Sequence, residues 1–393
     1  MNAPGGYPGP AFAAWHRRGG SVGWAPASAR GGTIGERRPV VGLACHEDVR
    51  RRYVDERDAQ RLQSVAEFRF RPFDVPSGLG GPAPRDAAAE SALAEFASDL
   101  DVLVVCHGAP FVSAEILDRS PRMRMLGELE GDRFGYRFDT GAVAARGVRI
   151  VDTTHGSSWP TAEWALALAL IGLRHAGRFF RRLIAHEPAF PPGYVWTNGP
   201  GYERAELSHK RIGMIGFGHV ARGLTRLLRP FEVDIIAYDP YAPRALGEAY
   251  GIVFGSLEAA LSADVVFCLL PLTSLTEHLL GREQLELLQP GCVFVNVSRG
   301  RVVNTAALLE RLALGDIFAC LDVFDPEPVP LDSPFRDLEN VFLSPHIGGM
   351  SEESRRRFFA LMVDECLRCF AGLEPYDELT PAVLSLRKSP ERH

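Results

Sequence analysis

Short, almost unbroken apolar runs alternate along this chain with longer segments whose apolar residues recur every three or four positions. The first pattern is typical of strands buried in a parallel sheet, and the second is typical of amphipathic helices. The runs that we predict as strands cover residues 40–44, 68–75, 102–106, 148–152, 212–215, 233–238, 265–270, 293–297, 318–323 and 341–343. Because helical patterns separate most of these runs, the sequence predicts an α/β protein built on parallel sheets.

The predicted helices cover residues 49–65, 87–100, 158–184, 257–262, 305–314 and 352–371. The segment 158–184 begins with a capping serine, an early proline and an acid in its first turn. Its first half is apolar on nearly every side, which indicates a helix that is buried on several sides. A hinge helix between two domains and a helix at a subunit interface both fit this pattern.

The stretch 210–239 has the pattern of a dinucleotide-binding unit. It reads as a strand, a glycine turn of the form Gly216-x-Gly218-x-x-Ala221, a helix and a second strand that ends on Asp239. Gly216 permits a tight turn, Gly218 lets the backbone approach a pyrophosphate, and Ala221 lets the helix pack close to the strand. An acid about 20 residues after the turn accepts the ribose hydroxyls of NAD and repels the extra phosphate of NADP. The sequence therefore predicts NAD binding, with a glycine-rich turn in another kind of α/β domain as the alternative.

The length and composition limit the class of protein. A chain of 393 residues predicts two or three domains, and its net charge of −6 argues against a nucleic-acid-binding face. The seven cysteines are scattered, and even Cys366 and Cys369 on one predicted helix indicate buried thiols rather than a metal or redox site. The most apolar segment, 162–173, is too short to span a bilayer and contains Glu163. We expect a cytoplasmic protein without a resident metal.

Residues 1–38 have a different composition from the rest of the chain. They are rich in glycine, proline and alanine, and their only acid is Glu36. No continuous apolar core of a secretory signal is present. We predict a disordered extension, with an amphipathic targeting segment as the alternative.

Polar residues follow several of the predicted strands. Arg299 lies just after the strand at 293–297, Glu327 follows the strand at 318–323, and His346 follows the strand at 341–343. In an open α/β sheet, ligands bind beyond the carboxyl ends of the strands. These polar residues therefore predict a single site at one edge of a sheet.

Four motifs of the chain resemble, in their order and spacing, those of the D-isomer-specific 2-hydroxyacid dehydrogenase family. This family includes phosphoglycerate, D-lactate and hydroxypyruvate dehydrogenases. The motifs are IGMIGFGHVARGL, LLPLTSLTEHLLG, NVSRGRVVNTAALLERL followed by LDVFDPEP, and SPHIGG. The resemblance covers residues 40–385 and implies that Arg299, Glu327 and His346 are the catalytic residues. It implies that Asp322 holds the carboxamide end of the nicotinamide, with a carboxylate that caps the following turn as the alternative. It implies further cofactor contacts, mostly through the backbone, at His219, Val220, Pro271, Val297, Ser298 and Gly348.

The chemistry of the three catalytic residue types suits the reduction of a 2-oxo acid. Histidine gains and loses a proton near neutral pH, so His346 suits the transfer of a proton to the carbonyl oxygen. Glu327 would orient the imidazole and favour its charged form. Arg299 offers a planar fork of donors for the substrate carboxylate and polarises the carbonyl as charge develops.

The chain departs from the family pattern in its first domain. The family has a glycine-rich loop whose backbone N–H groups bind the substrate carboxylate. Here the stretch 127–137 is bulky and places Glu128, Glu130 and Asp132 where an anion should bind. The family also has a histidine where this chain has Trp164. Two interpretations stay open: a changed substrate that is larger or carries a positive or hydroxyl-rich group, or a surface insertion beside an intact ordinary site.

We therefore expect two Rossmann-like or flavodoxin-like parallel-sheet domains with a cleft between them. Residues 39–156 with 348–393 would form a discontinuous substrate-binding domain, and residues 157–347 the NAD-binding domain. The resemblance implies an NAD-dependent oxidoreductase for a 2-hydroxy or 2-oxo acid and a homodimer, with no nucleic-acid or membrane partner. The alternatives are an NAD-binding regulatory protein like the corepressors of this fold, and a family member with an atypical larger substrate.

Overall fold

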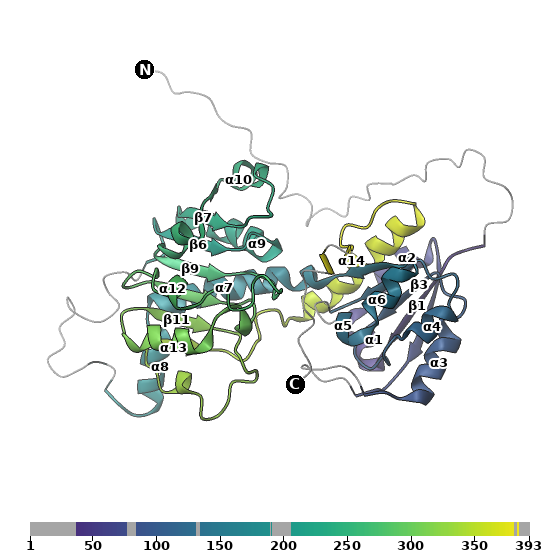
Figure 1. The fold of residues 1–393 in the computed structure, drawn as a ribbon, viewed down its shortest axis with the longest axis horizontal. Helices are drawn as coiled ribbons and strands as arrows, with labels where there is room; N and C mark the ends of the chain where they lie inside the picture. The colour runs from purple at the N-terminus through teal and green to yellow at the C-terminus, as the bar shows by residue number, and fades with distance from the viewer. Residues whose placement is uncertain are drawn as a thin grey trace, which may run out of the picture. The chain divides into compact units, whose positions relative to one another are not determined.

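The computed structural model describes residues 37–76, 84–130, 134–188, 190, 206–380 and 383–384, without the side chains of Phe134 and Gly135. Most of the N-terminal extension, Asp132 and the last residues of the chain lie outside the described residues. Two parallel sheets organise the rest (Figure 1). The predicted α/β fold class is confirmed.

The first sheet has five strands in the order β2-β1-β3-β4-β5. Its strands are β1 (Val40–Cys45), β2 (Glu67–Pro72), β3 (Val102–Val105), β4 (Met125–Glu128) and β5 (Arg149–Asp152). Every neighbouring pair is parallel. This is the flavodoxin-like order, in which the chain runs outward in both directions from the β1/β3 junction.

Helices cover the first sheet on two faces, and each face has its own apolar cluster. The helices are α1 (Glu47–Tyr53), α2 (Glu56–Gln63), α3 (Ala87–Ala97), α4 (Ala114–Asp118), α5 (Phe134–Arg137), α6 (Thr140–Ala145) and α14 (Glu352–Phe370). The long helix α14 comes from the far end of the sequence and lies beside α1 and α2 (Figure 1). Its Phe359 and Met362 pack in the same cluster as Leu43 and Val104 of the sheet. The C-terminal helix therefore completes the core of the first sheet, whereas the exact domain boundaries stay a prediction.

The second sheet has seven strands in the order β12-β11-β10-β9-β6-β7-β8, and all neighbours are parallel. Its strands are β6 (Arg211–Ile215), β7 (Asp234–Tyr238), β8 (Val253–Phe254), β9 (Val265–Cys268), β10 (Val293–Asn296), β11 (Phe318–Leu321) and β12 (Val341–Leu343). The order reverses between β6 and β9. In a doubly wound sheet, the crevice at such a reversal is where a dinucleotide binds.

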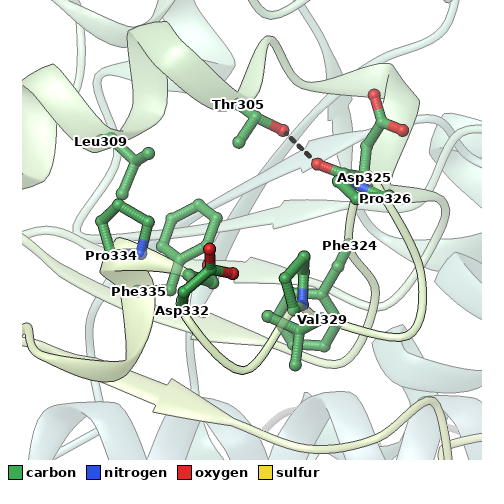
Figure 2. A pocket seen from close by; sticks show the side chains of 11 residues that line it. Thr305, Leu309, Phe324, Asp325, Pro326, Val329, Asp332, Pro334 and Phe335 are labelled. Atoms are coloured by element: carbon green, nitrogen blue, oxygen red, sulfur yellow. Dashed lines mark hydrogen bonds between the residues drawn. The ribbon is translucent and has the colours of Figure 1, made fainter.

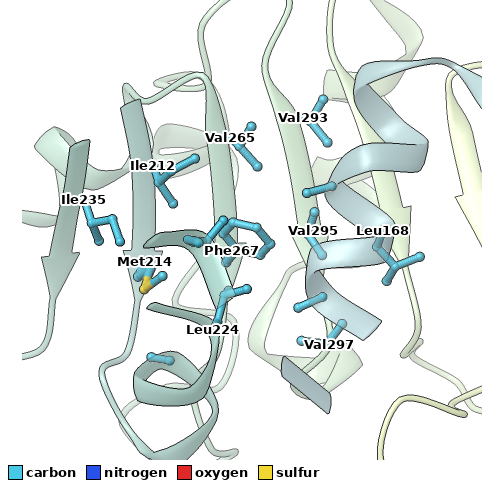
Figure 3. Close-up of a cluster of buried hydrophobic side chains, with 14 of the residues drawn as sticks. Leu168, Ile212, Met214, Leu224, Ile235, Val265, Phe267, Val293, Val295 and Val297 are labelled. Carbon is cyan, nitrogen blue, oxygen red and sulfur yellow. The ribbon is translucent and has the colours of Figure 1, made fainter. Parts of the chain in front are cut away.

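The core of the second sheet lies under two helices, α7 (Ser158–Leu173) and α9 (His219–Leu228). Figure 3 shows Leu168 of α7 and Leu224 of α9 beside Phe267 and Val295 of the sheet. The remaining helical segments are η1 (Thr154–Ser157), α8 (Ala176–Ile184), η2 (Arg229–Phe231), α10 (Ala245–Tyr250), α11 (Leu257–Leu261), α12 (Arg282–Leu285), η3 (Gly300–Val302), α13 (Thr305–Ala313) and η4 (Pro334–Arg336).

Two of the predicted helices are each divided in two. The helix predicted over 49–65 is α1 and α2, because Asp55 between them caps α2 by accepting the N–H of Arg57. The helix predicted over 158–184 is α7 and α8, which separate at His175, whose φ of 50° is left-handed. In both places a local hydrogen bond or backbone turn outweighs an unbroken apolar pattern.

Two expectations about composition can be compared with the structure. All seven cysteines are free and buried, including Cys366 and Cys369 on α14, as predicted. Among the described helices, none is long and apolar enough to cross a membrane.

A buried carboxylate on α14 anchors the segment that follows this helix. Glu365 is 1% exposed and accepts the backbone N–H groups of Tyr376, at 3.0 Å to each oxygen, and Asp377, at 3.2 Å. The anchored segment then bonds to β5, where Leu379 N–H donates to Ile150 O at 2.8 Å. Burial raises the pKa of Glu365 to about 7, and the negative Asp377 adds to this shift while the N–H donors oppose it.

We predict that Glu365 weakens the fold as the pH rises. Its pKa is higher in the folded protein, so the folded state binds more protons between the ordinary value of 4.5 and about 7. The stability that this group contributes is present in full below pH 4.5 and is lost as the pH rises through 7. Urea unfolding of wild type and Glu365→Gln should show the wild type losing roughly 2–3 kcal/mol relative to the variant between pH 4.5 and 8.

The control is Glu232→Gln, because the side chain of Glu232 is 76% exposed. This variant should follow the wild type at every pH. A difference in the free energy of unfolding between wild type and Glu365→Gln that stays constant from pH 4.5 to 8 would contradict the raised pKa of Glu365.

Candidate functional site

The two glycines of the turn between β6 and α9 have different physical roles. Gly216 has a φ of 94°, which strains any residue with a side chain, and an added Cβ would lie 3.0 Å from Leu269 O. Gly218 has an ordinary extended backbone, with φ −78° and ψ −159°. An added Cβ at Gly218 would meet no described heavy atom within 4 Å. The fold therefore requires Gly216, whereas Gly218 leaves open space before the N-terminus of α9.

Such an open, side-chain-free space at a helix N-terminus fits the pyrophosphate of NAD. Backbone N–H groups and the helix dipole favour an anion there, and a side chain at Gly218 would occupy the approach. Ala221 is fully buried in the core beneath α9, as the close packing of helix on strand requires. The glycine turn predicted from the sequence thus has the geometry of a dinucleotide site.

Asp239 braces this turn from the end of β7. Its Oδ2 accepts the N–H of Phe217 at 2.9 Å, and its Oδ1 accepts the N–H groups of Tyr241 at 2.9 Å and Ala242 at 3.0 Å. A carboxylate has about four acceptor positions, so ribose hydroxyls can join these donors. Contact of Asp239 with the ribose stays a prediction.

His219 is the first residue of α9, and its ring stacks on His155 with 4.7 Å between centroids. Burial, together with the neighbouring His155 and Arg222, lowers the pKa of His219 to about 4. The side chain is still partly exposed. The ring is therefore neutral at pH 7 and brings no positive charge to a phosphate, and contact through the backbone stays a prediction.

The loop after β10 carries Arg299, and the buried Asn296 shapes it. Asn296 Oδ1 accepts from Ser298 N–H at 3.0 Å and Ser298 Oγ at 2.8 Å, while its Nδ2 donates to Arg299 O at 3.3 Å. A Cβ on Gly300 would lie 1.8 Å from Phe324 O, so glycine is required for this loop to lie against the segment after β11. Asn296 was not predicted as a site residue, although a polar residue at the end of an apolar strand is a usable signal.

Glu327 and His346 come together at the carboxyl ends of β11 and β12. His346 Nδ1 donates to Glu327 Oε1 at 2.5 Å, and the side chains of His346 and Glu327 are 43% and 34% exposed respectively. His346 has a φ of 54°, a left-handed conformation that costs about 1–2 kcal/mol for a residue with a side chain. Arg299 lies on the loop of the adjacent strand β10, where its Nη1 donates to Ser298 O at 2.7 Å. The structure thus joins two of the three predicted catalytic residues directly and places the third on the neighbouring loop.

Asp322 fixes the loop that carries His346. It is 1% exposed and accepts hydrogen bonds from four groups around it. These donors are Trp164 Nε1 at 3.2 Å, Ser344 Oγ at 2.5 Å, Ile347 N–H at 3.1 Å and Gly348 N–H at 2.9 Å. These contacts match the alternative of a turn-capping carboxylate, while the contact with a nicotinamide carboxamide stays a prediction.

Trp164 links α7 to this network. Its Nε1 lies 3.2 Å from both Asp322 Oδ1 and Ser344 Oγ, so the indole supports the carboxylate and the hydroxyl together. From the sequence, Trp164 was only a departure from the family pattern without a predicted role, because its partners lie more than 150 positions away.

The other predicted cofactor residues lie at the same edge of the sheet. Pro271 follows β9, Val297 and Ser298 follow β10, and Gly348 follows β12. Val297 and Ser298 are each 7% exposed, which restricts them to contacts through the backbone. Val220 is half-buried in the first turn of α9.

A cavity of about 240 Å³ lies beside the segment that leads to Glu327 (Figure 2). Apolar and proline side chains line most of it, and Thr305 Oγ1 donates to Asp325 O at its edge at 3.1 Å. Arg299, Glu327 and His346 are not among its lining residues. The cavity therefore belongs to the packing behind the loop and not to the site. In the described part of the chain, no group of three or more His, Cys, Asp or Glu side chains could hold a metal ion.

We predict that Gly218→Val weakens NADH binding at least tenfold without destabilising the protein. The valine would fill the space before α9, whereas the backbone at this position suits any residue. Gly216→Ala is the matched comparison and should lower the free energy of unfolding by about 1–2 kcal/mol because of its positive φ. Calorimetric titration with NADH and urea unfolding measure the two effects. Normal NADH affinity in Gly218→Val would contradict the assignment.

Comparison with known proteins agrees with this geometry. Residues 167–348 match the family model described as "D-isomer specific 2-hydroxyacid dehydrogenase, NAD binding domain". A D-3-phosphoglycerate dehydrogenase of Methanocaldococcus jannaschii is 30% identical over 305 residues, and the match covers 76% of this chain but only 54% of that protein. A glyoxylate reductase of Korarchaeum cryptofilum is 30% identical over 302 residues, covering 75% of this chain and 86% of that protein.

Solved structures share the fold across both sheets. The crystal structure of a phosphoglycerate oxidoreductase from Rhizobium etli superimposes with a TM-score of 0.69 at 25% identity, covering 88% of this chain and 100% of that one.

Proposed function

We propose that this chain, which belongs to the D-isomer-specific 2-hydroxyacid dehydrogenase family, reduces a 2-oxo acid to the D-2-hydroxy acid with NADH. As a member of this family, the chain is an NAD-dependent oxidoreductase of hydroxy acids, and NAD is its cofactor. The substrate, the direction and the catalytic roles are our proposal. The observation that carries it is the short hydrogen bond between His346 and Glu327 at the carboxyl edge of the dinucleotide-binding sheet.

Arg299 would bind and polarise the substrate. Its guanidinium is always charged and offers paired donors that match a carboxylate. The brace from Asn296 and the tight contact at Gly300 hold the backbone of this loop. Arg299 would thus receive the carboxylate of the 2-oxo acid and stabilise negative charge on the carbonyl oxygen.

His346 would deliver the proton. Because Nδ1 donates to Glu327, Nε2 is the ring nitrogen that would exchange a proton with the substrate oxygen. The carboxylate of Glu327 would stabilise the charged imidazolium, and Asp322 accepts from the Ser344 hydroxyl before the histidine and from the Ile347 N–H after it. NAD supplies the hydride in reduction and accepts it in oxidation.

The comparisons favour an enzyme over the regulatory alternative. The relatives are named as dehydrogenases and reductases, among them glyoxylate/hydroxypyruvate reductases of Pectobacterium atrosepticum and Shigella boydii. We propose a small 2-oxo acid of this type as the substrate class. Seven free, buried cysteines support a reducing, cytoplasmic location.

We predict that His346→Ala lowers kcat by a factor of about 10²–10⁴, because the proton donor is lost. Glu327→Gln should lower kcat less, because the amide still accepts a hydrogen bond but no longer stabilises the imidazolium. NADH affinity should change less than twofold in both variants. Initial rates with hydroxypyruvate and glyoxylate, together with NADH titration, separate the two effects.

The control is His209→Ala, because that side chain is 73% exposed. It should keep the wild-type rate. Full activity in His346→Ala would show that another group transfers the proton.

We also propose a homodimer formed through α7 and α8. Phe180, Leu183 and Ile184 on α8 are each 61% exposed, which is unusual for three large apolar side chains on one helix. The arginines of α8 fix its other face, since Arg181 donates to Val341 O at 2.8 Å and Arg182 pairs with Glu339. The apolar face is therefore held in a fixed orientation, as an interface requires.

We predict that Phe180→Glu with Leu183→Glu converts a dimer into a monomer with an unchanged fold. Light scattering after gel filtration gives the mass, and circular dichroism checks the fold. Leu331→Glu is the control, since Leu331 is 90% exposed on a different segment and should leave the mass unchanged. A monomeric wild type would disprove the interface.

A further inference from the structure

The loop after β12 packs against one face of helix α7. Ser157, Thr161 and Trp164 follow the helical spacing i, i+4 and i+7, so they lie on the same side of α7. A Cβ on Gly348 would lie 3.1 Å from Trp164 Cδ1, and a Cβ on Gly349 would lie 3.3 Å from Ser157 Cβ. Because the backbone of this loop approaches α7 so closely, the helix is the surface that supports it.

Trp164 makes a polar contact with the network around this loop. Its Nε1 lies 3.2 Å from Asp322 Oδ1 and 3.2 Å from Ser344 Oγ, and these acceptors belong to side chains that are 1% and 5% exposed. The indole itself is half-buried and packs against the core under α7. An unpaired buried acceptor is costly, so the indole N–H is one of the donors that stabilise this carboxylate.

The chemistry of the indole fixes the direction of these hydrogen bonds. An indole N–H can only donate. The Ser344 hydroxyl therefore accepts from Trp164 and gives its own hydrogen to Asp322 Oδ1, at 2.5 Å. A histidine, which the family has at this position, could instead accept through one ring nitrogen and let the hydroxyl turn. Tryptophan thus permits one arrangement of the network.

The network ends at the backbone on both sides of His346. Ser344 O accepts the His346 N–H at 3.0 Å, and Asp322 accepts the N–H groups of Ile347 at 3.1 Å and Gly348 at 2.9 Å. The left-handed φ of His346 persists only where its surroundings hold it. These contacts therefore set the position of the imidazole, and the indole holds the two acceptors against α7.

We propose that Trp164 is a positioning residue for proton transfer by His346, and that its N–H group carries this role. This inference rests on the proposed function. It gives a role to a residue by which the chain departs from the family pattern. Loss of the N–H would let the loop shift, and a shift of about 1 Å in a reacting group can lower a rate by as much as about 10²-fold.

Two variants of Trp164 separate the N–H group from the bulk of the ring. Trp164→Phe keeps an apolar aromatic ring without the donor, whereas Trp164→His is smaller but keeps a ring N–H about as far from Cβ. We expect kcat to fall about tenfold in Trp164→Phe, and to be at least about threefold higher in Trp164→His than in Trp164→Phe. Packing alone predicts the opposite order, because phenylalanine fills more of the core. The substrate is whichever of glyoxylate, pyruvate and hydroxypyruvate the wild type reduces fastest.

The affinity for NADH distinguishes a misplaced histidine from general damage to the site. The glycine turn and Asp239 follow β6 and β7, whereas the network lies at the ends of β11 and β12. Calorimetric titration of both variants should therefore give a dissociation constant for NADH close to the wild-type value. A loss of NADH affinity as large as the loss of kcat would overturn the positioning role.

Ser344→Ala decides if Trp164→Phe does not fold, as thermal denaturation would reveal. This variant keeps the indole but removes the hydroxyl between it and Asp322. Its kcat should also fall at least about threefold with NADH affinity retained. A wild-type kcat in folded Ser344→Ala would then overturn the inference.

The control is Trp159→Phe, which is the same substitution on the same helix. Trp159 is 37% exposed, and its Nε1 donates to Glu163 Oε1 at 2.6 Å. This variant also loses an indole hydrogen bond, but one outside the network around Asp322. It should keep the wild-type kcat.

The outcomes separate this inference from the function on which it rests. Turnover by the wild type with an unchanged kcat in folded Trp164→Phe, or with Trp164→His no faster than Trp164→Phe, would overturn the role of Trp164 alone. A wild type that binds NADH but reduces none of the 2-oxo acids would overturn the proposed function and this inference with it.

Discussion

The candidate site depends on one buried carboxylate. Asp322 is removed from water at the end of β11, and such a group is stable only when donors surround it. The donors come from α7 and from both sides of His346, so satisfying the charge also sets the position of the histidine. The left-handed backbone of His346 is held in the same way, since the residues on either side cannot relax independently. The hydrogen bonds to Asp322 therefore both stabilise the buried charge and orient His346.

The two sheets place polar side chains in the same position. Both place polar side chains beyond the carboxyl ends of parallel strands, and both contain a histidine bonded to a glutamate. In the second sheet this pair has a glycine turn, a helix N-terminus and Arg299 at the same edge, which together favour an anion. In the first sheet the buried Arg137 lies 3.8 Å from the buried Glu128.

Much of the architecture follows from local patterns in the sequence. Apolar runs between helical segments predicted nearly all the longer strands, and the order of Gly216, Gly218 and Asp239 predicted the dinucleotide unit, because each signal lies within a few residues or one turn. Contacts between distant residues could not be predicted in this way. Trp164 with Asp322, and Arg137 with His107, join residues on different elements, and only the folded sheets bring them together. The break at His175 was missed because it depends on one backbone angle within an unbroken apolar pattern.

The central claim is that this chain transfers a hydride between NADH and a 2-oxo acid. The most direct measurement follows NADH absorbance during incubation with glyoxylate, pyruvate, hydroxypyruvate, phenylpyruvate, 2-oxoglutarate and larger sugar-derived 2-oxo acids, with NADPH in a parallel series. We expect turnover of at least one acid, with NADH strongly preferred because Asp239 would repel a 2′-phosphate. Tight NADH binding without turnover of any acid would contradict the claim.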